Sequence, residues 1–594
     1  KSVFQQFAHC LVTNGRLFAA GIILCVFATV CDAQRPAKTQ PLEDAIINVV
    51  LEWGPCLGRC DADYNGDGIV NEFDLIEVIN NGPPEFADAR KFTMHSNQPK
   101  HLPPSARYPD LNFYGAGNVI ETPAIDFARL HAEDELAPSG PFRVGIVHNL
   151  DVRVDRDGQW TRLPDLGWLW TITIRVTGAP AARLQIKGWA PSSDTSLFIV
   201  NADDSAESFG PITGGYPSHN GELWTPIIFN DEINVELFVT SSLTDNARNA
   251  DLRLAGAVNF YGLPVGGGSG ATPPLCCHLD ASCPAYADWA KVADGVAAFF
   301  FTNDNSAFVC SGSMLNRVES SEDFTPLFAT ATHCGVTFSN VNSVVAVWFY
   351  ETQIGQFGCT VGCTAPTACS GCPQCAGCPP NWNTLPQTPG AFALARDVDT
   401  DWTLVGLSMD DAIPSGVTYL GWASETMSNG AEATGIHHPR GTYKKISLGE
   451  KDNNNGTSPT GSTNSCVNDN YYRIDWPAGN GVLEPGSSGS PLLGAQGRVR
   501  GVASCSNWSC TGDTSSTYGR LDQAYDDQIQ PFLNPADPVY VDSNESGGTG
   551  TFFNPFGALF KALYAVREGS AIIIESGTYG ASWTTTKAMT LQAN

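Results

Sequence analysis

The chain has 594 residues, too many for one hydrophobic core, so we expect several domains. With 42% hydrophobic residues, 59 glycines and 39 prolines, its composition favours globular, loop-rich and β-rich domains. Acidic residues outnumber basic ones by 61 to 33, for a net charge of −28. This balance argues against a nucleic acid or an anionic membrane as partner, because no basic surplus exists to neutralise phosphates. It suits an exported protein or one that binds calcium.

The first 33 residues have the pattern of a secretory signal peptide. An apolar run over residues 17–30 follows a short basic and polar start, and small residues lead up to Ala33. The alternative is a membrane anchor, but the apolar run is too short to span a bilayer. We therefore expect cleavage after Ala33, export, and no membrane span in the processed chain. Because the chain begins with Lys, we expect it to be a fragment.

Residues 34–90 hold two short helical patterns around an acidic loop. The loop carries oxygen-bearing side chains at the first, third, fifth, ninth and twelfth positions and Gly at the sixth, as calcium loops do. Its expected Ca²⁺ ligands are Asp63, Asn65, Asp67, Ile69, Asn71 and Asp74. Asp at the twelfth position resembles a dockerin more than an EF-hand, which implies a cohesin-like or cell-surface partner, although dockerins have two such loops. The alternative is an acidic turn without metal.

Alternating apolar runs dominate residues 106–262, after one short helical pattern at 124–136. Turn residues separate the runs, of which 168–174 and 234–239 are examples. The pattern predicts a β-sandwich. A Gly-rich stretch, residues 265–270, then forms a flexible linker.

The block after this linker is rich in cysteine: 14 of the 19 cysteines lie between Cys276 and Cys510. In an exported protein this even count favours disulfides. Four cysteines spaced by two residues, from Cys369 to Cys378, nearly match the spacing of iron–sulfur ligands in ferredoxins, and zinc is a further alternative. We favour disulfides in an inserted loop.

Two segments of this block supply a base and a carboxylate. An apolar strand that contains Cys310 is followed by a run of small residues that ends in His333 and a second cysteine. Further on, Asp401 stands directly before an apolar strand. Asp397 and Asp399 are close rivals, but neither directly precedes the apolar run.

A third segment supplies a nucleophile. Ser488 lies between Gly486 and Gly489, and glycine lets the backbone turn sharply so that the hydroxyl is exposed. The order His, Asp, Ser resembles the trypsin/chymotrypsin family of serine peptidases. The resemblance implies a double β-barrel in which Ser488 attacks, His333 acts as general base and Asp401 orients His333. It also implies an oxyanion hole formed by the amides of Gly486 and Ser488.

Four short runs narrow the resemblance to bacterial lysyl endopeptidases over residues 275–536: 277–284, 435–441, 485–491 and 518–520. The resemblance implies three disulfides: Cys310 with Cys334, Cys277 with Cys510, and Cys283 with a cysteine of the 359–378 insert, for which Cys359 is the candidate.

The residues that would select the substrate depart from the family pattern. Lysyl endopeptidases carry a lysine-selecting Asp two residues before the Tyr-Gly-Arg run, where this chain has Ser516. Trypsin carries its Asp six residues before the nucleophile, where this chain has Val482. A buried carboxylate is what would compensate a desolvated lysine ammonium, and Asp513 is near enough to substitute. We take Ser504, Asp513 and Ser516 as specificity candidates and leave the P1 preference open.

The activation switch of trypsin-like zymogens is also missing, because its Asp directly before the nucleophile is replaced by Ser487. Residues 106–262 resemble the pro-regions of such peptidases, which implies assistance in folding and shielding of the cleft. A ligand-binding sandwich is the alternative. Residues 537–594 resemble the first turns of a right-handed parallel β-helix but are too few for a stable solenoid, so we expect a C-terminal truncation.

The sequence thus predicts a multidomain, mainly β, secreted precursor of a serine endopeptidase that acts on proteins or peptides without a catalytic cofactor. Its expected parts are a signal peptide (1–33), a small helical calcium module (34–90), a β-sandwich pro-region (106–262), a chymotrypsin-like double β-barrel (275–536) and the start of a parallel β-helix (537–594). The alternative is a cell-surface calcium-binding scaffold protein with an inactive peptidase domain.

Overall fold

This computed structural model describes residues 86–92 and most of residues 102–593. Its longest gaps cover residues 93–101, 241–251, 264–274, 353–384 and 453–467. Of residues 1–85 it describes only two short antiparallel strands, β1 (Gly54–Pro55) and β2 (Ile69–Val70). No helix in the described part of the chain is long and apolar enough to cross a membrane.

Several predictions lie outside the described residues. They are the signal peptide over residues 1–33, the calcium loop over residues 63–74 apart from β2, the Gly-rich linker, Cys359, and the four cysteines from Cys369 to Cys378. The Ca²⁺ ligands and the dockerin-like partner therefore stay predictions.

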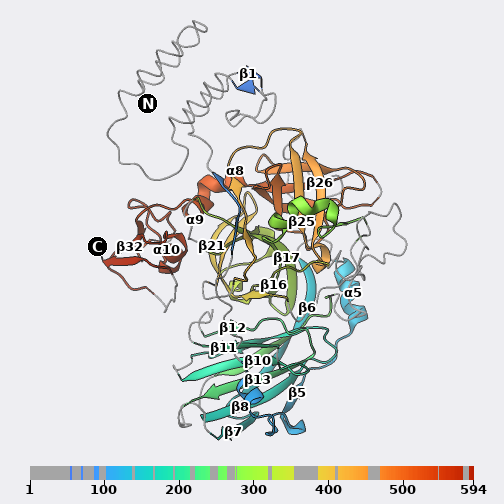
Figure 1. Ribbon diagram of the computed structural model, residues 1–594, viewed down its shortest axis with the longest axis vertical. Helices are drawn as coiled ribbons and strands as arrows, with labels where there is room; N and C mark the ends of the chain where they lie inside the picture. Colours follow the sequence, from blue (N-terminus) through green and yellow to red (C-terminus); the bar gives the residue numbers. More distant parts are fainter. Residues whose placement is uncertain are drawn as a thin grey trace.

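Two packed sheets form a β-sandwich in the first half of the chain (Figure 1). The strands of the first sheet are β5 (Val119–Glu121), β7 (Gln159–Leu163), β8 (Gly167–Arg175), β10 (Thr195–Asn201), β11 (Ser208–Ile212) and β13 (Glu232–Val239). Those of the second are β6 (Phe142–Arg153), β9 (Ala182–Lys187), β12 (Leu223–Trp224) and β14 (Arg253–Asn259). Alternate side chains point inward, as a strand period of two requires, so that Trp170, Ile172 and Ile174 of β8 are buried against Leu184 and Ile186 of β9. The helix predicted at 124–136 is α5 (Phe127–Leu136).

The sandwich shares a sheet with the domain after it in the chain. Strand β6 pairs antiparallel with the first half of β17 (Ser306–Leu315), so the second sheet runs on into that domain as one eleven-stranded sheet. A common core lies beneath this junction, where the rings of Phe260 and Phe300 meet with centroids 5.8 Å apart. The buried Arg183 donates to the carbonyl of Ser343 at 2.8 Å. Backbone pairing and buried side chains therefore both join the sandwich to the domain that follows it in the chain.

The first barrel comes next in the chain. Its strands are β16 (Val296–Asn303), β17, β18 (Leu327–Ala331), β19 (Val345–Val347), β20 (Gln387–Pro389), β21 (Ala391–Asp397) and β22 (Trp402–Leu407). They pair in the order β20-β19-β16-β17-β18-β22-β21, and only Gly390 separates β20 from β21. The interior is aromatic, with Phe299, Phe328 and Trp348 buried together.

The second barrel is closed. Its strands are β25 (Glu432–His437), β26 (Lys445–Lys451), β27 (Tyr471–Trp476), β28 (Pro491–Gly494), β29 (Val499–Ser506) and β30 (Thr514–Arg520). Strand β28 pairs with both β25 and β29, which completes the ring. Three short strands extend its sheet: β3 (Phe86–Ala87), β15 (Leu279–Asp280) and β24 (Trp422–Ala423). A separate pair, β4 (Arg90–Lys91) with β23 (Thr418–Tyr419), packs on the first barrel, where Tyr419 joins the aromatic core. The protein is thus mainly β with two closed or nearly closed barrels, consistent with a chymotrypsin-like double barrel.

A C-terminal module packs against the first barrel (Figure 1). After α8 (Leu521–Ala524), η9 (Tyr525–Ile529) and α9 (Gln530–Leu533), it contains β31 (Val539–Val541), α10 (Leu559–Ala565), β32 (Ala571–Ile574) and β33 (Thr590–Ala593). The three strands pair in parallel, as in the predicted solenoid, although the β-helix assignment itself stays a prediction. The buried guanidinium of Arg317 donates to carbonyls of Phe532, Tyr564 and Val566 at 2.9–3.1 Å and so ties α9 and α10 to the barrel.

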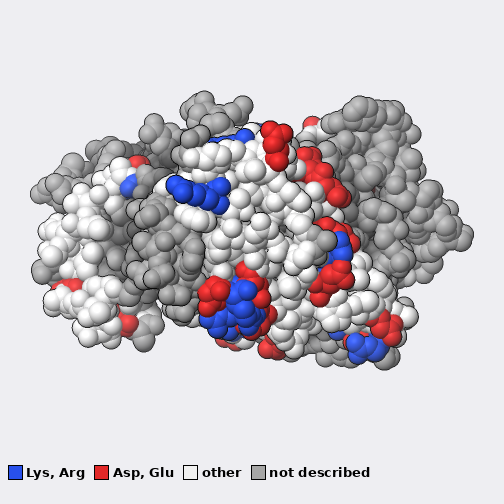
Figure 2. All heavy atoms as spheres, turned by 90° about the horizontal axis from the view of Figure 1, so that it is seen from below, with Lys and Arg blue, Asp and Glu red and all other residues white. Residues whose placement is uncertain are grey.

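Charged side chains on the face shown in Figure 2 are few, and several basic groups lie beside acidic ones. Such pairs occur in the sandwich, where Arg153 contacts Asp155 at 2.8 Å and Arg156 contacts Asp157 at 2.9 Å. On this face the described residues form no extended basic field of the kind that binds phosphates.

Candidate active site

The predicted nucleophile lies on a tight turn between β27 and β28. Gly486 and Gly489 both have positive φ, +94° and +80°, which side chains rarely adopt. A Cβ at Gly489 would lie 2.1 Å from Thr330 Oγ1. The backbone N–H of Ser311 on β17 donates to the carbonyl of Ser488 at 2.8 Å, so a strand of the first barrel holds the turn. Both glycines therefore allow a sharp turn of the backbone, as the sequence suggested.

The other two predicted residues meet this serine. His333, on the short helix η4 (Thr332–Cys334) after β18, has its Nε2 2.7 Å from Ser488 Oγ. Its Nδ1 lies 2.6 Å from Oδ2 of Asp401, and its backbone N–H donates to Oδ1 of the same carboxylate at 2.8 Å. Asp401 directly precedes β22 and has a φ of 62°, a left-handed conformation that a non-glycine residue adopts only where the surroundings fix it. The three side chains form one chain of hydrogen bonds.

The rival carboxylate Asp397 serves a different purpose. It accepts the hydroxyl of Thr400 at 2.6 Å and the backbone N–H of Asp399 at 2.9 Å, and so closes the turn between β21 and β22. This turn positions Asp401 next to His333.

Ser504, a specificity candidate, lies instead beside the carboxylate. It is on β29, and its Oγ donates to Oδ2 of Asp401 at 2.5 Å. This contact was missed from the sequence, because nothing local distinguishes one serine of β29 from another. It gives the buried Asp401 a third hydrogen-bond donor.

The environment shifts both titrating groups in the direction that an ion pair requires. Burial by itself would lower the pKa of His333, but the Asp401 carboxylate outweighs it and holds that pKa above its ordinary value. Burial would raise the pKa of Asp401, yet His333 and the donors around the carboxylate hold it below its ordinary value. His333 keeps 30% of its side chain exposed, so it remains accessible from solvent.

Two backbone amides of the nucleophile turn are available to a ligand. Among the described residues, neither the N–H of Gly486 nor that of Ser488 donates to a protein acceptor. Buried backbone donors are nearly always paired in folded proteins. Two unpaired ones on the same turn as an activated serine are therefore suited to an oxyanion.

Two of the implied disulfides are present, and they support this region. Cys310 on β17 is bonded to Cys334 next to His333, and Cys277 is bonded to Cys510. Cys283 is also disulfide-bonded, while its implied partner Cys359 lies outside the described residues.

Among the described residues, neither of the other two specificity candidates hydrogen-bonds to the triad. Ser516 on β30 is fully buried; it accepts the indole N–H of Trp476 and donates to Ser506, both at 2.9 Å. Asp513 is exposed and accepts the backbone N–H of Ala478 at 2.9 Å. Ser516 thus carries an uncharged hydroxyl that already has two hydrogen-bond partners.

Known proteins resemble this chain in the same region. Residues 275–520 match the family described as lysyl endopeptidase, C-terminal domain. The chain is similar to the lysyl endopeptidase of Pseudomonas aeruginosa, with 28% identity over 375 residues that cover 61% of this chain and 73% of that protein. These sequence matches support a serine peptidase.

Solved structures of proteases are also similar, at low scores. One is the HtrA-type protease AlgW with a tripeptide, with 16% identity, a TM-score of 0.26, and coverage of 41% of this chain and 62% of that chain. Another is the MamO protease domain of Magnetospirillum magneticum, with 13% identity, a TM-score of 0.26, and coverage of 40% and 97%.

Proposed function

We propose that this chain is the precursor of a secreted serine endopeptidase that cleaves peptide bonds through an acyl-enzyme. The observation that carries the proposal is the hydrogen-bonded chain from Ser488 through His333 to Asp401, next to two unpaired amides. Export is supported by the signal-like start of the sequence and by disulfides, which persist in oxidising compartments. A cell-surface scaffold with an inactive peptidase domain is not favoured, because both sequence matches are to peptidases.

The geometry supplies each group that acyl transfer needs. As Ser488 Oγ attacks the scissile carbonyl, its proton passes to His333 Nε2 across the 2.7 Å hydrogen bond. Asp401 holds Nδ1 protonated and stabilises the imidazolium that forms. The amides of Gly486 and Ser488 donate to the oxyanion, and His333 then protonates the leaving amine. In deacylation His333 takes a proton from a water molecule, which attacks the acyl carbon. The ester bond to Ser488 Oγ then breaks, His333 returns the proton to Oγ, and the carboxylic acid product leaves.

The proposal does not include a preference for lysine. A lysine ammonium removed from water needs a carboxylate partner. At the corresponding position Ser516 is neutral, and Asp513 is exposed and engaged with a backbone amide. Because Ser516 is neutral, this position suits an uncharged P1 side chain.

For the sandwich we propose support of folding as its main role. The pairing of β6 with β17 and the shared core place it under the strand that carries Cys310. Among the described residues, no sandwich residue hydrogen-bonds to His333 or Ser488. The contacts that support the proposal are therefore those to the barrel and not to the cleft.

A fluorophosphonate probe tests the proposed activity. We expect the probe to label the wild-type protein on Ser488 and to stop peptide hydrolysis. Ser488→Ala should remove both the labelling and the activity, whereas Ser339→Ala, at an exposed serine on the loop after His333, should change neither. Undiminished hydrolysis by Ser488→Ala would refute the proposal.

A further inference from the structure

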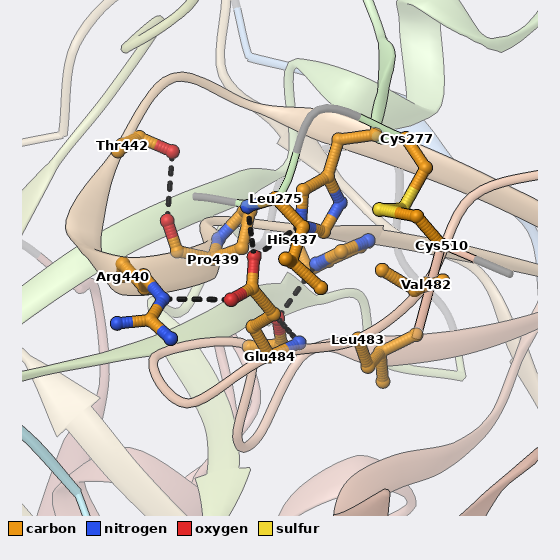
Figure 3. Close-up of polar contacts among 12 residues, drawn as sticks. Leu275, Cys277, His437, Pro439, Arg440, Thr442, Val482, Leu483, Glu484 and Cys510 are labelled. Atoms are coloured by element: carbon orange, nitrogen blue, oxygen red, sulfur yellow. Dashed lines mark hydrogen bonds and ion pairs between the residues drawn. A yellow bond between two sulfur atoms is a disulfide. The ribbon is translucent and has the colours of Figure 1, made fainter. Parts of the chain in front are cut away.

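A buried carboxylate that the proposed mechanism does not use lies at the start of the nucleophile turn. Glu484 is four residues before Ser488, and its side chain has no solvent exposure. An isolated buried charge is strongly unfavourable, so such a group requires a full set of donors. Figure 3 shows the carboxylate between Arg440 on one side and the segment of Leu275 and Cys277 on the other.

Three donors from two distant segments satisfy this carboxylate. Oε1 accepts from Nε of Arg440 at 2.7 Å. Oε2 accepts from Nε2 of His278 at 2.8 Å and from the backbone N–H of Leu275 at 2.7 Å. The disulfide between Cys277 and Cys510 joins the segment that carries the last two donors to the second barrel. Burial alone would raise the pKa of Glu484, but His278 and Arg440 hold it below its ordinary value, so the carboxylate is ionised.

The same partners also hold the backbone of the turn. The backbone N–H of Arg440 donates to the carbonyl of Pro485 at 2.6 Å, and Ser487 N–H donates to the carbonyl of Glu484 at 2.9 Å. A Cβ at Gly486 would lie only 2.7 Å from the nitrogen of Arg440, so the two chains are in close contact there. Side chain and backbone of Arg440 thus bind consecutive residues of the turn that presents the Gly486 and Ser488 amides.

We propose, resting on the proposed function, that Glu484 is a positioning residue. Through Arg440, His278 and the Leu275 amide it fixes the turn in the shape that aims the Gly486 and Ser488 amides at the oxyanion. It touches neither substrate nor the reacting atoms. Its effect is therefore on stabilisation of the transition state and not on binding of the substrate in its ground state.

Replacement of Glu484 would lower stability whether the residue positions the turn or only supports the fold. A matched control is therefore needed. Asp280 and Lys445 form another buried ion pair of the second barrel, at 2.9 Å with side-chain exposures of 1% and 5%. Among the described residues, neither is hydrogen-bonded to residues 484–488. Asp280→Asn therefore removes a comparable charge without a bond to the turn.

The experiment measures kcat and KM on a peptide amide together with inhibition by the corresponding peptide aldehyde, whose hemiacetal oxygen would occupy the oxyanion position. We expect Glu484→Gln to lower kcat and weaken the aldehyde by about 10- to 100-fold, since loss of a whole oxyanion donor costs about 100- to 1,000-fold. KM should change less than about threefold. Asp280→Asn should lower the melting temperature but leave kcat and the aldehyde affinity unchanged.

Arg440 gives a second route should Glu484→Gln fail to fold, because its side chain is 22% exposed and tolerates change better. Arg440→Gln should reproduce the kcat loss, and Arg440→Lys, which keeps the charge, should recover part of it. An unchanged kcat in a folded Glu484→Gln or Arg440→Gln protein would overturn the inference, as would an equal kcat loss in Asp280→Asn. Activity that survives Ser488→Ala would instead overturn the proposed function.

Discussion

Replacement of Gly489 by alanine tests how strictly the turn fixes the nucleophile. The new Cβ would lie 2.5 Å from the carbonyl oxygen of Ser311 and 2.7 Å from the nitrogen of Ala331. Both are backbone atoms at barrel strands and do not rotate away, so the turn must move by about 0.5 Å to reach even 3.0 Å, below which real Cβ contacts essentially do not occur. The left-handed φ of +80° adds about 1–2 kcal/mol of strain.

Such a shift moves Ser488 relative to His333. Because a displacement of 1 Å can reduce a rate by about 100-fold, we expect Gly489→Ala to lower kcat/KM by about 10- to 100-fold, equivalent to about 1.4–2.7 kcal/mol. Gly479→Ala is the control, since Gly479 has a φ of +88° with nothing within 4 Å of its Cβ. It carries the same strain without the contact, and should lose about 1–2 kcal/mol of unfolding free energy in urea but no activity. Equal kcat/KM losses in the two variants would refute the reasoning.

Three charged groups give further predictions. The raised pKa of His333 should place the acid limb of kcat/KM above pH 6.5, because His333 must be neutral to act as the base. Protonated His333 also stabilises the fold. This contribution is fully present below pH 6.5 and is lost as the pH rises through the raised pKa. A limb below 6.5 would contradict this. Asp401→Asn should reduce kcat by about 10⁴-fold. The His333 backbone N–H needs the amide oxygen at the Oδ1 position, so the NH₂ takes the Oδ2 position and donates to His333 Nδ1. The imidazole proton then stays on Nε2, which cannot accept the proton of Ser488; a loss under tenfold would contradict this. Arg317→Met should lower the free energy of unfolding in urea by about 3 kcal/mol or more, because three buried carbonyls lose their donor at a cost of about 1–3 kcal/mol each. Arg129→Met, at an exposed arginine, should change it by less than about 0.5 kcal/mol. A loss as small in Arg317→Met as in Arg129→Met would show that Arg317 does not anchor the C-terminal module.

The parts of the site that have a short local sequence pattern could be predicted from the sequence. His333 follows a strand of small apolar residues, Asp401 opens an apolar strand, and Ser488 lies between glycines, so each carries its own short signal. The structure brings these three together. The strand periodicity of the sandwich and the position of α5 were likewise visible in the alternation and in one helical pattern.

Contacts between distant segments had no such local signal. The donors to Glu484 are separated from it by 206 residues for His278 and by 44 for Arg440, and a lone Glu before a Pro-Gly turn reads as an ordinary exposed residue. The contact of Ser504 with Asp401 had no local signal for the same reason, because the register between β29 and the Asp401 turn is set by the packing of the two barrels. The specificity role of Ser504 stays a prediction. The pairing of β6 with β17 is a register of the whole fold, which strand propensity does not contain.

The shared sheet has a consequence for any shortened form of this protein. Residues 142–146 of β6 cover the first half of one edge of β17, and β18 covers the second half. A protein made from residues 275–536 alone would expose unpaired N–H and C=O groups at residues 306–309, next to apolar side chains such as Phe300 that now lie in the common core. An unprotected edge beside an apolar surface is a template for aggregation. The sandwich therefore also acts as an edge cover, and a soluble enzyme would need it either in the same chain or as a second, non-covalently bound chain after cleavage.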